Sequence, residues 1–137
     1  MTNKIYSYEI KYDFINAEKT KTVSEGEILA ETKTRIVCLE GRYKFSEYIT
    51  IFNKTKEDKS SIYQDLNKAD TSNFKIGDYK DEVSCRIHLT EKPKSEKVIF
   101  NKLTKELNKF IQKKYSKYNI GSLDFSDVET ERGENNE

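Results

Sequence analysis

The sequence is poor in the residue types that most often build catalytic and metal centres. Its 137 residues include no tryptophan, one histidine and two cysteines, and Cys38 and Cys85 lie far apart. Zinc ribbons and thioredoxin-type redox pairs need closely spaced cysteines, so the spacing argues against both. Five scattered glycines form neither GxGxxG nor GxxxxGK, the glycine-rich motifs that hold nucleotide phosphates. We therefore predict no cofactor, no metal site and no enzymatic activity. An enzyme built on the chemistry of tyrosine and lysine side chains is the alternative that the sequence leaves open.

Long hydrophobic runs are missing as well. No apolar stretch approaches the roughly 18 residues that span a bilayer, and the first residues lack the apolar segment of a signal peptide. A chain of this length with only two cysteines fits a reducing compartment. We therefore predict a cytoplasmic protein that binds no membrane, in which Cys38 and Cys85 are both reduced and buried.

Net charge is close to zero, at +1, which argues against a generic nucleic-acid binder. The charge is unevenly distributed, because Ser122–Glu137 holds six acidic residues against one arginine. From Glu129 onward no large apolar residue offsets the entropy lost when a chain becomes ordered. We predict a folded domain over residues 1–121 and an acidic, largely disordered tail over 122–137. Three apolar residues are expected to dock the start of this tail: Leu123, Phe125 and Val128.

Alternation of apolar and polar residues predicts antiparallel strands. From Tyr6 to Phe14 every second residue is aromatic or aliphatic, as in a half-buried strand. Residues Thr20–Ala30 return as the second arm of a hairpin, in which Gly26 marks a bulge. Ile36–Leu39 and Val83–Leu89 are two further strands. Residues 45–53 fit a helical spacing too, but Ile49-Thr50-Ile51 favours a strand on propensity.

The longest element is an amphipathic helix from Glu96 to about Asn119, capped by Ser95 and ended by Gly121. A short helix is expected at residues 61–68 and a loop at 70–81. Together these elements predict an α+β fold: a single two-layer domain whose antiparallel sheet of four to five strands packs against the long C-terminal amphipathic helix.

His88 is the one imidazole of the chain. The sequence Ile87-His88-Leu89-Thr90 has the His-x-Thr spacing that two-histidine phosphoesterases use in pairs, but a second histidine is missing. A pair of Cys85 with His88 is also excluded, because residues three apart on a strand point to opposite faces. We predict an exposed His88 without a catalytic role.

Two groups of charged residues are candidate partner-binding surfaces. One is a row of lysines at spacings of three and four on the long helix: Lys102, Lys105, Lys109 and Lys113. Such a row can follow a phosphate backbone, or it can simply be a solvated face of the helix. The other lies in the acidic tail: Asp124, Asp127, Glu129 and Glu131. These acids either shield the lysines or imitate phosphates for a basic protein partner.

The leading hypothesis is a small non-enzymatic binding protein that acts on a macromolecular partner, most simply a protein. The bias toward Lys, Ile, Asn and Tyr with a single proline is typical of AT-rich bacterial or phage genomes. An inhibitor of a host defence protein is one instance of this function. The alternative is a nucleic-acid-binding accessory protein that uses the lysines. Few arginines and no aromatic residue among these lysines weaken that alternative.

Overall fold

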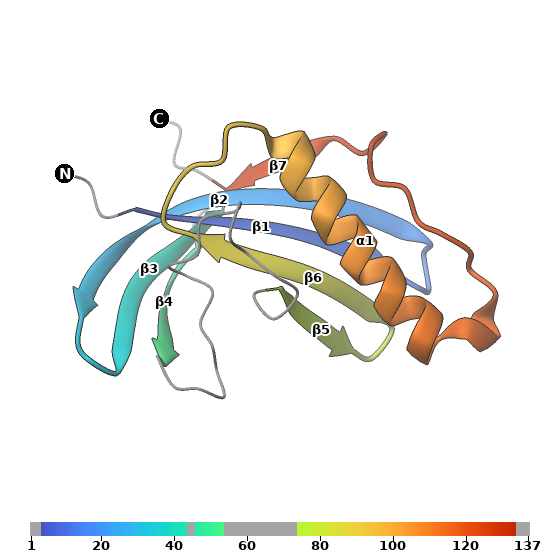
Figure 1. Cartoon of the computed structure of the whole chain (residues 1–137), viewed down its shortest axis with the longest axis horizontal. Helices are drawn as coiled ribbons and strands as arrows, with labels where there is room; N and C mark the ends of the chain where they lie inside the picture. Colours follow the sequence, from blue (N-terminus) through green and yellow to red (C-terminus); the bar gives the residue numbers. More distant parts are fainter. Residues whose placement is uncertain (1–3, 44–45, 54–73, 134–137) are drawn as a thin grey trace.

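One curled seven-stranded sheet forms the body of the protein, and one helix lies across part of one face (Figure 1). The computed structural model describes residues 4–43, 46–53 and 74–133. In chain order the elements are β1 (Lys4–Asp13), β2 (Glu18–Glu31), β3 (Arg35–Tyr43), β4 (Ser46–Asn53), β5 (Lys75–Tyr79), β6 (Glu82–Leu89), α1 (Glu96–Lys114), the 3-10 turn η4 (Ser116–Tyr118) and β7 (Thr130–Gly133). Six strands are antiparallel in the order β4-β3-β2-β1-β6-β5, and β7 pairs parallel with β2. The α+β class is confirmed, but the sheet has more strands than expected.

The predicted N-terminal hairpin is formed by β1 and β2. Ala17 adopts a left-handed conformation in the turn, with a φ of 52°. On β1, Tyr8 and Ile10 are buried toward α1, as the alternating pattern predicts. Their partners on the neighbouring strand β6, Ile87 and Cys85, are buried in the same cluster. Residues 46–53 form a strand rather than a helix, which confirms the preference for β4.

Helix α1 begins as expected and ends earlier. The Ser95 hydroxyl accepts a hydrogen bond from the backbone N–H of Val98 at 3.4 Å. The last α-helical residue is Lys114, five residues before Asn119, and a 3-10 turn follows. Tyr115 and Tyr118 extend the apolar pattern because their rings pack on Phe14, at 5.1 and 6.0 Å between centroids. A spacing of three residues suits a 3-10 turn as well as an α-helix, so the pattern predicted too long a helix.

No helix within the described ranges has the length and apolar character needed to cross a membrane.

The segment expected to be a loop contains the edge strand β5. Residues Lys75–Tyr79 pair antiparallel with β6, although this stretch carries a glycine and two charged residues. Asp78 connects the strand to the end of α1. Its Oδ1 atom accepts a hydrogen bond from the Tyr115 hydroxyl at 2.6 Å, and its other oxygen pairs with Lys114. Tertiary pairing therefore overrides a weak local preference for strand.

The acidic segment follows α1 and leads into β7 (Thr130–Gly133). Phe125 is buried under α1, so the predicted docking of the segment is confirmed. Beyond it, β7 pairs with residues 21–24 of β2. Arg132 donates two hydrogen bonds to the Glu96 carboxylate at 2.7 and 2.9 Å. Backbone pairing requires no apolar side chain, so β7 can pair with β2 although residues 130–133 include no large apolar residue. The helix expected at 61–68 lies outside the described residues, as do residues 134–137.

The two cysteines are free and buried on opposite faces of the sheet. Cys85 lies under α1, whereas Cys38 packs with Ile5 and Ile36 on the other face. Burial raises the pKa of each thiol to about 12. The thiolate, which is the reactive form, is therefore scarce at neutral pH.

Both thiols are expected to react slowly with a thiol-specific reagent in the native protein. Their labelling rates should fall far below the rate of a free cysteine, because the thiols are inaccessible and protonated. Spectrophotometric thiol titration measures this, and the same titration in denaturant should give two rapidly reacting thiols. Fast labelling of either cysteine in the native protein would contradict the packing described above.

Candidate functional site

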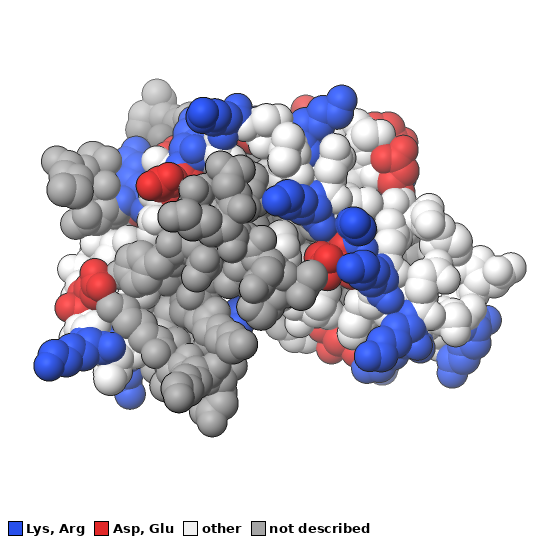
Figure 2. Space-filling view, in the orientation of Figure 1, with Lys and Arg blue, Asp and Glu red and all other residues white. Residues whose placement is uncertain are grey.

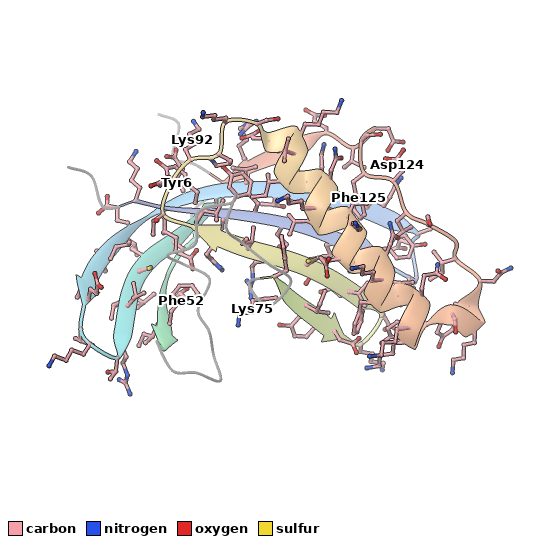
Figure 3. All side chains as sticks on the ribbon, viewed as in Figure 1. Tyr6, Phe52, Lys75, Lys92, Asp124 and Phe125 are labelled. Atoms are coloured by element: carbon pink, nitrogen blue, oxygen red, sulfur yellow. The ribbon has the colours of Figure 1, made fainter. Side chains whose placement is uncertain are left out.

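The face of the sheet that α1 does not cover holds a second, smaller core. Ile5, Ile36 and Cys38 are fully buried there, with Phe52 packed against them. Contacts link strands that are not neighbours in the sheet: the ring of Phe52 on β4 lies 4.8 Å from the ring of His88 on β6. The sheet therefore curls toward this face, and Figure 3 shows Phe52 at the curled end.

A buried polar cluster, Ser7–Glu40–His88, lies within this curl. The Ser7 hydroxyl donates a hydrogen bond to Glu40 Oε1 at 2.7 Å, and His88 Nε2 lies 3.2 Å from the same oxygen. Only 3% of the Glu40 surface and 5% of the His88 surface are exposed. The prediction of an exposed His88 is therefore wrong.

Electrostatics favour the ionised form of Glu40 in this cluster. Burial alone would raise the pKa of its carboxyl group. Hydrogen bonds from His88, Thr50 and Ser7, together with the electrostatic attraction of His88, outweigh burial and lower this pKa to about 2. The carboxylate joins side chains of β1, β4 and β6 to β3.

One glycine lets the backbone pack closely enough for this arrangement. A Cβ atom on Gly26 would collide with the carbonyl oxygen of Leu39 and lie 3.1 Å from the Cα of Glu40. The bulge of β2 lies between Ile28 and Ala30, so Gly26 marks a close approach of β3 and not the bulge itself. The sequence contains one sign of this cluster. Glu40 is an even number of residues from Ile36 and Cys38 on the same strand, so all three side chains point to the same face of the sheet.

The cluster is arranged to hold strands together. Ser7 and His88 both contact one carboxylate oxygen, so the Ser7 proton is directed to Glu40 and not to an imidazole. A nucleophile–base–acid relay needs the imidazole in the middle. In the described ranges, no group of three or more histidine, cysteine, aspartate or glutamate residues is placed to hold a metal ion.

The four predicted lysines form an exposed row along α1. We call this row the lysine ridge: Lys102, Lys105, Lys109 and Lys113. It extends about 16 Å along the helix axis at 1.5 Å per residue. Lys109 pairs with Glu106 at 3.6 Å. Figure 2 shows basic side chains following the line of α1 across this face of the molecule.

The acidic segment runs along the other flank of α1 (Figures 1 and 3). The Asn108 side chain fixes it there, because it accepts from the backbone N–H of Leu123 at 2.8 Å and donates to the carbonyl of Leu123 at 3.0 Å. Around the helix, Lys105 lies about 60° from Asn108, and the other three ridge lysines lie about 100–140° from it: Lys102, Lys109 and Lys113. The described part of the segment is therefore fixed beside the lysine ridge at Asn108, and shielding of the ridge by the tail stays a hypothesis.

The acids of this segment face β2 or solvent. Lys19 on β2 donates to the backbone carbonyl of Asp124 at 2.6 Å and to the Asp127 carboxylate at 3.4 Å. Glu129 and Glu131 are exposed. A groove of about 430 Å³ separates α1 from the segment and is lined in part by Lys21, Phe100 and Thr104. The structure thus places the two predicted charge groups on separate surfaces.

In comparisons with protein-family models, with curated proteins and with solved structures, nothing matched this chain.

Proposed function

We propose that the protein is a small non-enzymatic binding protein that acts on another protein, with the lysine ridge as a contact surface for acidic side chains of the partner. An inhibitor of a host defence protein is one instance of this function. The observation that carries the proposal is the position of the ridge: four exposed lysines lie in one row on a flank of α1 that the described part of the acidic segment leaves open.

The helix holds these charges in a fixed arrangement. Five apolar residues of α1 are buried against the sheet and set its rotation: Ile99, Phe100, Leu103, Leu107 and Ile111. Asp78 of β5 binds Lys114 and Tyr115 and anchors the C-terminal end of the helix. An array of like charges on a rigid helix attracts and orients a surface of opposite charge.

Nucleic acid is the second candidate partner, and the length of the ridge favours it. A row of about 16 Å can contact several phosphates of one strand. Against this candidate, α1 carries no arginine, and Glu106 lies beside Lys109 on the helix. A bidentate reader of bases or phosphates is therefore missing from α1, and protein remains the better supported partner.

Reversing two ridge charges should weaken partner binding about tenfold or more, because each glutamate replaces an attraction with a repulsion of order 1 kcal/mol. The test variant is Lys105→Glu with Lys113→Glu. The matched control is Lys33→Glu with Arg35→Glu, which changes the net charge equally at two exposed sites where β2 turns into β3, away from α1. Each tagged protein is used for affinity capture from its native cell after nuclease digestion, and the recovered partner is quantified by mass spectrometry.

A protein that the wild type and the control recover, and the ridge variant loses, supports the proposal. Equal recovery by all three proteins would show that the ridge is only a solvated helix face. Loss of capture after nuclease digestion, with a steep decrease in binding to mixed-sequence DNA or RNA as salt rises, would favour the nucleic-acid candidate instead.

A further inference from the structure

We propose that β4 pairs antiparallel with the β4 strand of a second copy of this chain, giving a two-fold dimer with one continuous sheet. Within the described residues, β4 is the last strand on its side of the sheet and only β3 pairs with it. An edge of this kind offers a row of backbone donors and acceptors to an incoming strand.

The sequence of β4 does not protect its edge. Its one charged residue is Glu47, near the start of the strand, and residues 48–52 are Tyr-Ile-Thr-Ile-Phe, with no charge, no proline and no glycine. The other outer strands differ: β5 has five residues including Lys75 and Asp78, and β7 has four residues including Glu131 and Arg132. Short length and charge are the usual means by which proteins prevent edge pairing, so β4 stands out as the unprotected edge.

Two isoleucines of β4 are exposed on the same side of the strand. Ile49 is 54% exposed and Ile51 is 53% exposed. On β3 they lie opposite Leu39 and Val37, which are only partly buried. Thr50 and Phe52 alternate with the two isoleucines, so their side chains point to the opposite face of the sheet. This is the face toward which the sheet curls, and Phe52 packs there against the second core. The exposed isoleucines therefore form the apolar part of the edge that a partner strand would cover.

An identical strand is a suitable occupant because β4 complements itself around Thr50. With the two-fold axis at Thr50, Ile49 of one copy lies opposite Ile51 of the other, and Tyr48 lies opposite Phe52. Cross-strand pairs of β-branched and aromatic residues stabilise antiparallel sheets. Moving the axis to Ile49 would place Glu47 opposite Ile51, and moving it to Ile51 would place Asn53 opposite Ile49. The sequence of β4 thus favours one register, and a two-fold axis closes the assembly as a dimer.

The lysine ridges do not oppose this assembly. Helix α1 packs on β1 and β6, and strands β2 and β3 lie between β1 and β4. The lysine ridges of the two copies are consequently away from the shared edge. The dimer does not depend on the function proposed for the ridge, so the ridge variant Lys105→Glu with Lys113→Glu should dimerise like the wild type.

Sedimentation equilibrium of the full chain over a range of concentrations tests the dimer. The wild type should fit a monomer–dimer equilibrium, and Ile51→Lys should raise the dimer dissociation constant about tenfold or more, because it places a charge opposite Ile49 twice per dimer. Ile15→Lys is the matched control at a site 71% exposed in the β1–β2 turn, and it should leave the constant unchanged. A wild-type chain that stays monomeric at all concentrations would overturn the proposal.

A cysteine pair tests the register and requires no destabilising charge. Ile49→Cys and Ile51→Cys proteins are prepared separately, mixed and oxidised, and the products are separated by non-reducing electrophoresis. The mixture should give a disulfide-linked dimer, because directly opposite residues have the Cα separation that a disulfide needs. Each variant alone should give much less, since its cysteines are not opposite each other. Equal cross-linking by the single variants, or none in the mixture, would contradict the register.

Discussion

Leu107→Ala is expected to lower the free energy of unfolding by about 2–5 kcal/mol. The Leu107 side chain is fully buried between α1 and the sheet, in the cluster that includes Ile10, Cys85 and Leu103. Removing its branched end eliminates apolar burial and leaves a cavity that the sheet can fill only in part. Equilibrium unfolding in urea, followed by circular dichroism, measures the change.

Leu29→Ala is the matched control for this substitution. It deletes the same atoms, but Leu29 is 51% exposed at the bulge of β2. Its effect should stay within about 0.5 kcal/mol, the usual range for surface substitutions. If the two variants unfolded at the same urea concentration, α1 would not be packed against the sheet as described.

Periodicity predicted the elements that bury one face. The alternating apolar residues of β1 and β6 and the apolar stripe of α1 are each buried against a neighbouring element. Burial of one face produces a regular spacing of apolar residues, which can be recognised in the sequence. Strands β5 and β7 are different, because they are held mainly by backbone pairing with β6 and β2. Backbone hydrogen bonds are available to any residue except proline, so neither strand has a distinctive pattern.

The candidate surfaces were predictable to different degrees. Lysines on one side of a helix follow from spacing alone, and the lysine ridge is exposed where the spacing places it. The position of the acidic segment depends on Asn108, whose bonds to Leu123 join residues from different parts of the chain. The Glu40–His88 contact depends on the curl of the whole sheet, which brings β3 to β6. No local pattern reports such a distance, and so His88 was expected to be exposed.

Glu40→Ala should destabilise the protein by about 3–5 kcal/mol, comparable to the loss of one partner from a buried ion pair. The substitution leaves the Ser7 hydroxyl and the His88 imidazole buried without their shared acceptor. The control is Glu27→Ala, which removes an exposed carboxylate from the neighbouring strand β2 and should change stability by less than about 0.5 kcal/mol. Urea unfolding at neutral pH compares the two, and an effect of Glu40→Ala as small as that of the control would show that the cluster does not stabilise the curl.

The Glu40 carboxylate should also make the free energy of unfolding depend on pH under acidic conditions. The pKa of Glu40 is lowered from 4.5 to about 2 by folding, so the unfolded chain binds the proton more readily than the folded chain does. Its contribution is therefore complete above about pH 4.5 and is lost as the pH falls toward about 2. A difference of this size corresponds to a few kcal/mol at most, at about 1.4 kcal/mol per pKa unit.

Urea unfolding of the wild type and of Glu40→Gln at several pH values isolates the effect, because glutamine keeps the shape of the side chain and cannot titrate. The gap in stability between the two proteins should narrow steadily between pH 4.5 and 2, and a gap that does not change over this range would show that another group accounts for the acid sensitivity.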